Sequence, residues 1–246
     1  MADPNVEGAA LAGLALRTAP DADALAERLA ADVANALRAA LEERGRASLV
    51  VSGGSTPAPM LDRLAREALD WSRVGVTLAD ERAVAPDHDD SNERLVRARL
   101  LVAEAAAARF TALYRADGDL ARVAAALDGL ARPFDVVLLG MGTDGHTASL
   151  FPDAPELEAA LGGDDPVAAT TPPSSPHPRI TLTRRALLDA RRCALHVTGR
   201  AKRDVLEAAM TAWRERGDAP GVAPIARTLG PASEAPGTSV EVWWAP

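Results

Sequence analysis

The sequence predicts an α/β fold of three layers, with helices on both faces of a mostly parallel central sheet. Short β-branched runs alternate with long segments rich in Ala, Leu and Arg, an alternation typical of βαβ units. The runs at 48–54, 74–81 and 134–142 are apolar on both faces, as the buried strands of a parallel sheet are. Together these observations predict an open sheet whose ligands bind at the carboxyl ends of its strands.

The individual elements follow from local patterns along the chain. Strands are predicted at 48–54, 74–81, 134–142, 178–183, 193–199, 224–229 and 239–245. Helices are predicted at 21–44, 57–69, 91–108, 117–131 and 200–216. The first helix has one apolar stripe with a spacing of four residues, formed by Leu25, Leu29, Val33 and Leu37. Residues 152–178 are rich in Pro, and we expect a long surface loop there rather than a linker between domains.

The composition is that of a globular protein, since 48% of the 246 residues are apolar and 25% are charged. We expect residues 1–246 to form a single domain in which residues 1–20 are peripheral. The one cysteine, Cys193, cannot form an internal disulfide, and Asp3 and Glu7 precede the first apolar run, unlike in a secretory signal. A cytoplasmic location is therefore expected, and no stretch approaches the roughly 20 apolar residues of a membrane helix.

The net charge is −8, from 27 basic and 35 acidic residues that are intermixed along the chain. This balance argues against binding to nucleic acid or to a membrane surface. A small anionic ligand is still possible, because the local field of a site decides what it binds. Of the 27 basic residues, 26 are arginine and one, Lys202, is lysine. A monomer and a homodimer are both compatible with the sequence.

The segment SGGSTP at 52–57 follows a predicted strand and precedes a predicted helix. Gly53 and Gly54 allow a tight turn and a close approach to a ligand, and Ser55 or Thr56 can cap the helix. Backbone N–H groups at such a helix start can bind an anion. An ordinary capped turn between a strand and a helix explains the segment equally well.

The segment GMGTDGHTASLFP at 140–152 follows another predicted strand. Its first six residues match the dinucleotide fingerprint G-x-G-x-x-G, but Pro152 interrupts the helix that this fingerprint requires, so we reject nucleotide binding. What remains is Asp144 and His146, framed by glycines at the carboxyl end of a buried strand. An imidazole there can act as a general base, because its reference pKa is about 6.5. The other histidines are interpreted as ordinary surface or core residues: His88, His177 and His196.

Two further segments place charges at the ends of predicted elements. Asp80 and Arg82 stand at the end of a predicted strand, and Ser91 can cap the helix that follows. A guanidinium such as that of Arg82 or Arg179 suits phosphate, although solvated charges at strand ends are common. Lys202 lies in the first turn of a predicted helix, where a cation opposes the helix dipole. Recruitment of an anion would explain this lysine, and so would simple solvation.

Five segments together resemble the 6-phosphogluconolactonase family in order and spacing: SGGSTP, ADERAV followed by DDSN, LGMGTDGHTASLFP, PPSSPHPRITLT and VTGRAK. The resemblance covers about residues 20–245, and LGMGTDGHTASLFP is its most specific part. It implies the α/β/α fold of sugar-phosphate isomerases and glucosamine-6-phosphate deaminases. It also implies hydrolysis of a small-molecule sugar phosphate lactone, 6-phospho-D-glucono-1,5-lactone, to 6-phospho-D-gluconate in the oxidative pentose phosphate pathway, with no metal and no organic cofactor.

The resemblance implies roles for the residues singled out above. His146 is the expected general base that activates water, and Asp144 orients its imidazole or stabilises the charged form. The expected substrate-binding residues are Gly53, Gly54, Ser55, Thr56, Asp80, Arg82, Gly142, Arg179 and Lys202. Gly142 is in this set because backbone N–H groups near it are candidates for the oxyanion site.

Two alternatives belong to other functional classes. The deaminase branch shares the aspartate-glycine-histidine core, but there a segment resembling IAFNEP places a glutamate where this chain has Phe151, so the lactonase is favoured. A sensor that binds a sugar phosphate without turning it over would not need a titratable base such as His146, which favours an enzyme.

Overall fold

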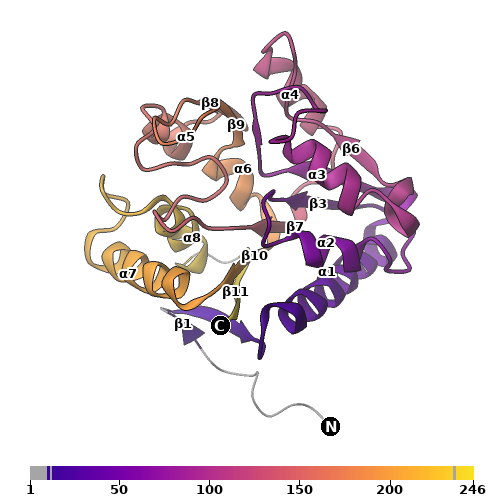
Figure 1. The fold of residues 1–246 in the computed structure, drawn as a ribbon, viewed down its shortest axis with the longest axis horizontal. Coiled ribbons are helices and arrows are strands. Elements are labelled where there is room, and N and C mark those ends of the chain that lie inside the picture. Colours follow the sequence, from indigo (N-terminus) through magenta and orange to yellow (C-terminus); the bar gives the residue numbers. More distant parts are fainter. Residues whose placement is uncertain (1–9, 12, 235–236) are drawn as a thin grey trace.

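The computed structural model describes residues 10–11, 13–234 and 237–246. The main sheet of these residues has eight strands and runs through the middle of the molecule (Figure 1). In spatial order the strands are β1 (Ala10–Leu11), β2 (Leu14–Thr18), β11 (Ser239–Ala245), β10 (Ala190–Thr198), β7 (Phe134–Leu139), β3 (Ala47–Val51), β4 (Val74–Leu78) and β6 (Arg109–Thr111). Apart from the antiparallel β1–β2 pair, neighbouring strands are parallel.

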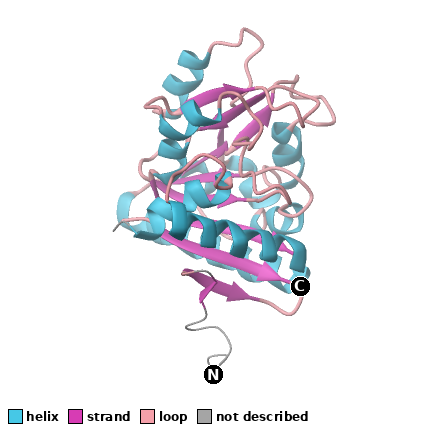
Figure 2. Ribbon diagram, turned by 90° about the vertical axis from the view of Figure 1, so that its left-hand side faces the viewer, coloured by secondary structure: helices cyan, strands magenta, loops and turns pink. Residues whose placement is uncertain are grey.

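Helices pack on both faces of this sheet, as Figure 2 shows. They are α1 (Ala22–Arg44), α2 (Ala58–Leu64), α3 (Asn92–Arg99), α4 (Leu120–Leu127), α5 (Leu157–Gly162), α6 (Arg184–Leu188), α7 (Arg200–Arg216) and α8 (Pro224–Glu234), with 3-10 turns at Trp71–Arg73 and Ala103–Ala107. The predicted α/β/α fold with a mostly parallel sheet is therefore confirmed. In the described part of the chain, no helix combines the length and the apolar character needed to cross a membrane.

The longest helix shows how the sequence forms the core. Asp21 caps α1 by accepting the N–H of Ala24 at 2.8 Å, and Gly45 ends it with a φ of +72°. The predicted apolar stripe is buried against the sheet, with no member more than 1% exposed: Leu25, Leu29, Val33 and Leu37. Burial of such a side chain stabilises the fold by about 1.5–3 kcal/mol, so this face of α1 holds the helix on the sheet.

A second, antiparallel sheet stands beside the main one, in the order β5 (Asp80–Arg82), β9 (Arg179–Leu182) and β8 (Val167–Thr170). Its register places Asp80 opposite Thr181 and Arg82 opposite Arg179. The run predicted as one strand at 74–81 is therefore divided between the two sheets, as β4 and β5. Two arginines that are far apart in the sequence become neighbours.

The run at 224–229 was predicted as a strand, and this prediction is wrong, because these residues begin α8. Residues 224–230 are all buried, so burial in this run shows neither one helix face nor the alternation of a strand. A short apolar run fits either type of element, and periodicity over six residues does not distinguish them.

Two expectations about irregular segments also change. The segment 152–178 is not a single long loop, because it contains α5 and β8. Part of the segment 1–20, expected to be peripheral, forms β1 and β2 at one end of the main sheet, where Leu14 and Leu16 of β2 are buried. Residues 1–9 and 12 lie outside the described residues.

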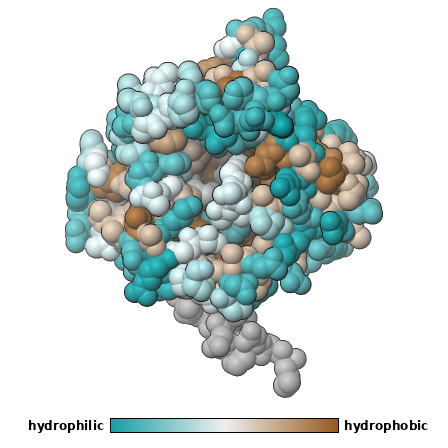
Figure 3. All heavy atoms as spheres, in the orientation of Figure 1, coloured by the Kyte–Doolittle hydropathy of each residue, from teal (hydrophilic) through white to brown (hydrophobic). Residues whose placement is uncertain are grey.

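The face of the molecule drawn in Figure 3 is mainly polar. Figure 3 shows a hydrophilic face on which apolar residues form small, separate groups. Among the described residues, Val102 is the large hydrophobic residue that is exposed, at 39%. We therefore look for function in a hollow of the surface rather than in an apolar patch.

Candidate active site

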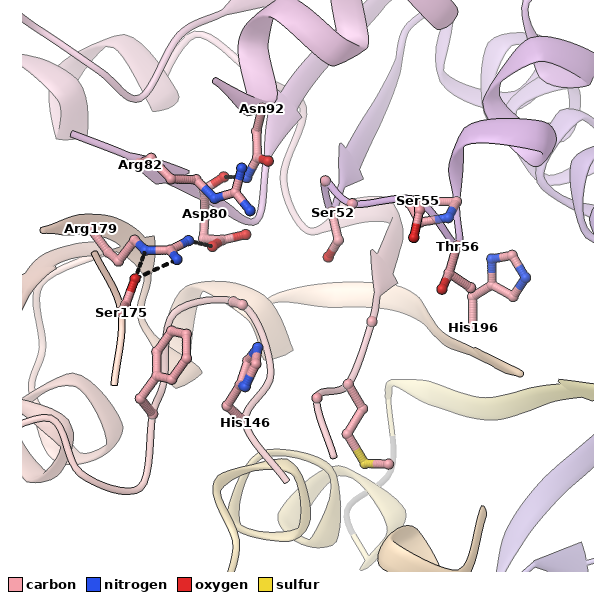
Figure 4. Close-up of a pocket in the computed structure, with 18 of the residues that line it drawn as sticks. Ser52, Ser55, Thr56, Asp80, Arg82, Asn92, His146, Ser175, Arg179 and His196 are labelled. Carbon is pink, nitrogen blue, oxygen red and sulfur yellow. Dashed lines mark hydrogen bonds and ion pairs between the residues drawn. The ribbon is translucent and has the colours of Figure 1, made fainter. Parts of the chain in front are cut away.

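A cleft of about 380 Å³ opens where the carboxyl ends of β3, β7 and β10 meet the three-stranded sheet, the edge at which open α/β sheets bind ligands. Figure 4 shows Arg82 and Arg179 on one side, Ser55 and Thr56 on the other, and His146 between them. Ten of the eleven residues singled out in the sequence line this cleft: Gly53, Gly54, Ser55, Thr56, Asp80, Arg82, Gly142, His146, Arg179 and Lys202. The eleventh, Asp144, reaches it through His146.

The loop after β3 is fixed by contacts that require glycine. The hydroxyl of Ser52 donates to the carbonyl of Leu138 at 3.0 Å, which ties the end of β3 to β7. A Cβ on Gly53 would lie 1.9 Å from Oδ1 of Asn92, so a larger residue would displace that amide. Gly54 has a φ of +97°, a conformation that other residues rarely adopt. The loop can therefore bring its backbone close to a ligand.

The two predicted helix caps have different outcomes. Within the described residues no side-chain hydrogen bond caps α2, whose cap is Pro57, so the expected capping by Ser55 or Thr56 is wrong. Both hydroxyl-bearing residues line the cleft instead. The cap of α3 is confirmed, because Oγ of Ser91 accepts the N–H of Arg94 at 3.2 Å.

The consecutive residues Glu81 and Arg82 contact different parts of the structure: Glu81 binds the start of α3, and Arg82 lines the cleft. Glu81 is buried and accepts the backbone N–H groups of Asn92 at 2.8 Å and Glu93 at 2.6 Å, which anchors the start of α3. Burial raises the pKa of Glu81, although these hydrogen bonds oppose the rise. Arg82 lines the cleft and donates from Nη1 to the carbonyl of Asp90.

Arg179 is almost fully buried and is held from three sides. It donates to the hydroxyl of Ser175 from Nε at 3.1 Å and from Nη2 at 2.6 Å. Its Nη1 lies 3.8 Å from the carboxylate of Asp80, which in turn accepts the hydroxyl of Ser149 at 2.6 Å. The guanidinium also lies 5.5 Å from the ring centre of Phe151. Its planar donor fork is therefore fixed before any ligand arrives.

His146 and Asp144 form a hydrogen-bonded pair at the end of β7. Nδ1 of the imidazole lies 2.6 Å from Oδ1 of the carboxylate, which also accepts the backbone N–H of His146 at 3.1 Å. A Cβ on Gly142 would lie 2.3 Å from two atoms of the imidazole and 2.5 Å from this oxygen. The imidazole stacks on Phe151, with ring centres 4.0 Å apart and planes inclined by 22°. The glycine thus leaves the space that the pair occupies.

The bond to Asp144 determines which nitrogen of His146 can act. An ionised carboxylate only accepts hydrogen bonds, so Nδ1 carries the proton in the neutral imidazole. Nε2 then keeps its lone pair and is the nitrogen that can accept a proton from another molecule.

Lys202 and His196 line the cleft together. Lys202 lies in the first turn of α7, as predicted. His196, near the end of β10, is 4% exposed, and burial together with the charge of Lys202 lowers its pKa to about 4. The imidazole is therefore uncharged at neutral pH.

Sequence reasoning did not select several of the side chains that line the cleft as site residues, among them Asn92, Phe151, Ser175 and His196. His196 carried a signal, because it is a polar residue at the end of an otherwise apolar strand, where α/β sheets bind ligands. Ser175 lies in the segment PPSSPHPRITLT, but only Arg179 was selected from it, because Ser175 lies near the cleft through the pairing of β9 with β5.

Among the described residues, one group of side chains could hold a metal ion, and it does not line the cleft: His88, Asp90 and His177. Nε2 of His177 lies 2.9 Å from Oδ2 of Asp90, and the N–H of Asp90 donates to Nδ1 of His88 at 3.1 Å. These hydrogen bonds account for the arrangement and join the loop after β5 to the loop before β9.

An open parallel sheet whose strand ends carry a carboxylate-bonded histidine and several cations defines an α/β enzyme that acts on a small anionic molecule. The family model described as "Glucosamine-6-phosphate isomerases/6-phosphogluconolactonase" matches residues 20–235. The chain belongs to this family.

Individual relatives agree. A 6-phosphogluconolactonase from Pseudomonas aeruginosa is 46% identical over 83% of this chain and 89% of its own length. One from Rhizobium meliloti is 45% identical over 91% of this chain and 95% of its own length. The crystal structure of a 6-phosphogluconolactonase from Shewanella baltica superposes with a TM-score of 0.87 at 40% identity, covering 98% of this chain and 99% of that one. A monomeric glucosamine-6-phosphate deaminase, with a TM-score of 0.71 at 19% identity, shares the fold.

Proposed function

We infer that the chain hydrolyses 6-phospho-D-glucono-1,5-lactone to 6-phospho-D-gluconate in the oxidative pentose phosphate pathway. The observation that carries this inference is the Asp144-bonded imidazole of His146 in a cleft with Arg82, Arg179 and Lys202, in a chain whose relatives are named 6-phosphogluconolactonase. The ring of Phe151, which stacks on His146, is also an apolar group at the position where the deaminase branch is expected to have a glutamate.

The proposed base is Nε2 of His146. It takes a proton from a water molecule while the water oxygen forms a bond to C1 of the lactone, and the imidazole becomes positively charged. Asp144, bonded to Nδ1 at 2.6 Å, stabilises this charge and holds the ring in place. General-base catalysis of this kind contributes roughly 10²–10⁴-fold in rate.

The second half of the reaction returns the proton. The bond between C1 and the ring oxygen breaks, the imidazolium gives its proton to that oxygen, and a hydroxyl group forms on C5. The carbon that was C1 of the lactone becomes a carboxylic acid, which ionises. Backbone N–H groups near Gly142 are the proposed donors to the oxyanion that forms between the two steps.

The phosphate is proposed to bind away from the reacting carbon. The expected contacts are the loop from Gly53 to Thr56, Arg82, Arg179 and Lys202, which line the cleft together. Asp80 completes the set by holding Arg179 at 3.8 Å. A fixed phosphate makes the attack of water effectively intramolecular, because it restricts the motion of the sugar.

A coupled assay tests the function. Glucose-6-phosphate dehydrogenase generates the lactone, and acid release is followed with and without the protein. We expect acceleration by the protein, and for His146→Ala a fall in kcat of roughly 10²–10⁴-fold with 6-phosphogluconate still bound. Near-normal turnover by His146→Ala, after correction for spontaneous hydrolysis, would show that another group is the base. Binding of 6-phosphogluconate by the wild type without faster hydrolysis would point to a sensor.

Other expectations stay predictions. These are a single domain over residues 1–246, a cytoplasmic location, the absence of nucleic-acid and membrane partners, and the choice between a monomer and a homodimer.

A further inference from the structure

His196 is a buried imidazole on the wall of the cleft that lacks a partner. Neither Nδ1 nor Nε2 has a hydrogen-bond partner among the described residues, and the residue is 4% exposed. Buried polar atoms in native proteins are nearly always paired, because an unpaired one loses its hydration without compensation. The pairing of this imidazole is therefore expected to come from the cleft that it lines.

Other unpaired polar atoms gather at the same place. Nε of Arg82 and Oδ1 of Asn92 are buried without partners in the described structure, and both residues line the cleft. Thr228 and Trp243 carry such atoms elsewhere. Buried polar atoms without partners among the described residues therefore belong to cleft-lining side chains from three different elements, β5, α3 and β10.

The neighbours of His196 indicate which part of a ligand it meets. In Figure 4 it lies on the same side of the cleft as Ser55 and Thr56, and the charge of Lys202 acts on it. Phosphate oxygens accept hydrogen bonds, and a neutral imidazole offers one N–H. An uncharged donor beside Lys202 adds a bond to the phosphate without repulsion between two cations.

We propose that His196 is a substrate-binding residue that donates its N–H to the phosphate group beside Lys202. This inference rests on the proposed function, which supplies the phosphorylated substrate. It adds to the expected phosphate contacts a neutral donor from the end of β10.

The variant His196→Phe tests the proposal, because it keeps most of the volume of the side chain and removes both nitrogens. We expect the Kd for 6-phosphogluconate, measured by isothermal titration calorimetry, to rise roughly 10- to 100-fold, the effect of one hydrogen bond to a charged group. KM should rise in parallel, with kcat within about threefold of wild type, because the phosphate lies away from the reacting carbon. His196→Gln, which retains an N–H donor, should recover part of the affinity.

Thr228→Val is the matched control. It also removes an unpaired buried polar atom, but from α8 rather than from the cleft lining, and it should leave Kd and KM unchanged. A Kd of His196→Phe within about twofold of wild type would overturn the proposal, and so would a loss of melting temperature at pH 7 with no change in Kd. An equal loss of affinity for gluconate, which has no phosphate, would place the contact on the sugar and would also contradict it.

A second measurement uses the wild-type protein and covers the case in which His196→Phe does not fold. In nitrogen-15 spectra of the histidine rings, addition of inorganic phosphate or 6-phosphogluconate should shift the His196 resonances and slow the exchange of its N–H. Unchanged resonances at saturating ligand would refute the contact. Wild-type protein that binds 6-phosphogluconate with this shift but does not hydrolyse the lactone would contradict the proposed function alone. Normal hydrolysis with unchanged resonances would contradict the His196 contact alone.

Discussion

The buried imidazole of His196 is predicted to make the stability of the fold depend on pH. Burial and the charge of Lys202 lower the pKa of His196 from 6.5 to about 4 in the folded protein. In the unfolded chain the pKa returns to the ordinary value of about 6.5. Between these values the unfolded chain binds a proton that the folded protein does not, so stability falls as the pH falls from 6.5 toward 4.

The size of this effect follows from the difference between the two pKa values, at about 1.4 kcal/mol per unit. At pH 5, about 1.5 units below the unfolded value, the loss is about 2 kcal/mol, and near pH 4 it approaches about 3 kcal/mol. The variant His196→Phe has no group that titrates there. Relative to wild type, its free energy of unfolding should therefore improve by about 2 kcal/mol between pH 7 and pH 5.

Urea denaturation followed by circular dichroism at pH 7 and pH 5 measures this difference. Comparison of the two proteins cancels the titration of carboxylates that they share, including that of Glu81. Thr228→Val should keep the wild-type pH dependence. Equal pH dependence for wild type and His196→Phe, within about 0.5 kcal/mol, would mean that His196 is charged or solvated in the folded protein and would refute the reasoning.

Three further substitutions probe the cleft. Gly142→Ala places a Cβ 2.3 Å from atoms of the His146 imidazole. We expect kcat to fall by roughly 10²-fold, with a smaller change in the Kd for 6-phosphogluconate. An unchanged kcat would show that His146 and Asp144 can shift to make room for the Cβ. Asp144→Asn keeps a hydrogen-bond acceptor but removes the negative charge that stabilises the imidazolium of His146. We expect kcat to fall by roughly 10²-fold, while KM stays within a few-fold of the wild-type value. A change confined to KM would contradict the proposed role of Asp144. Lys202→Arg keeps the charge but replaces a compact ammonium with a larger planar group, and we expect KM to rise about 10-fold; a normal KM would show that either cation suffices.

Much of the fold and most of the cleft could be predicted because their signals are local. Buried β-branched runs identify the parallel strands, and glycine-rich turns at the ends of β3 and β7 mark the edge where ligands bind. The stripe of α1 is likewise visible within one helix. The rest depends on pairings between distant segments. The register that brings Arg82 opposite Arg179 is one example, and no local pattern encodes it.

His196 illustrates a different limit. As a polar residue in an apolar strand it fits a satisfied core histidine as well as a ligand contact, and only the absence of partners among the described residues distinguishes the two. Asn92 is similar, because in the sequence it is only the residue that follows a helix cap. In the structure its amide donates to the carbonyl of Asp80 and lies directly beside Gly53. Both roles depend on tertiary contacts.

The distribution of charge connects these observations. Elsewhere in the chain a buried cation such as Arg227 is neutralised by carboxylates, with Glu158 at 2.6 Å and Asp218 at 2.8 Å. In the cleft, Lys202 and Arg82 make no ion pair with a carboxylate of the described residues, although the net charge is −8. Positive charge left unpaired in a partly buried cleft attracts an anion more strongly than the same charge in open water. We therefore expect these cations to attract the phosphate of the proposed substrate, whereas the net charge of −8 argues against binding to polyanions.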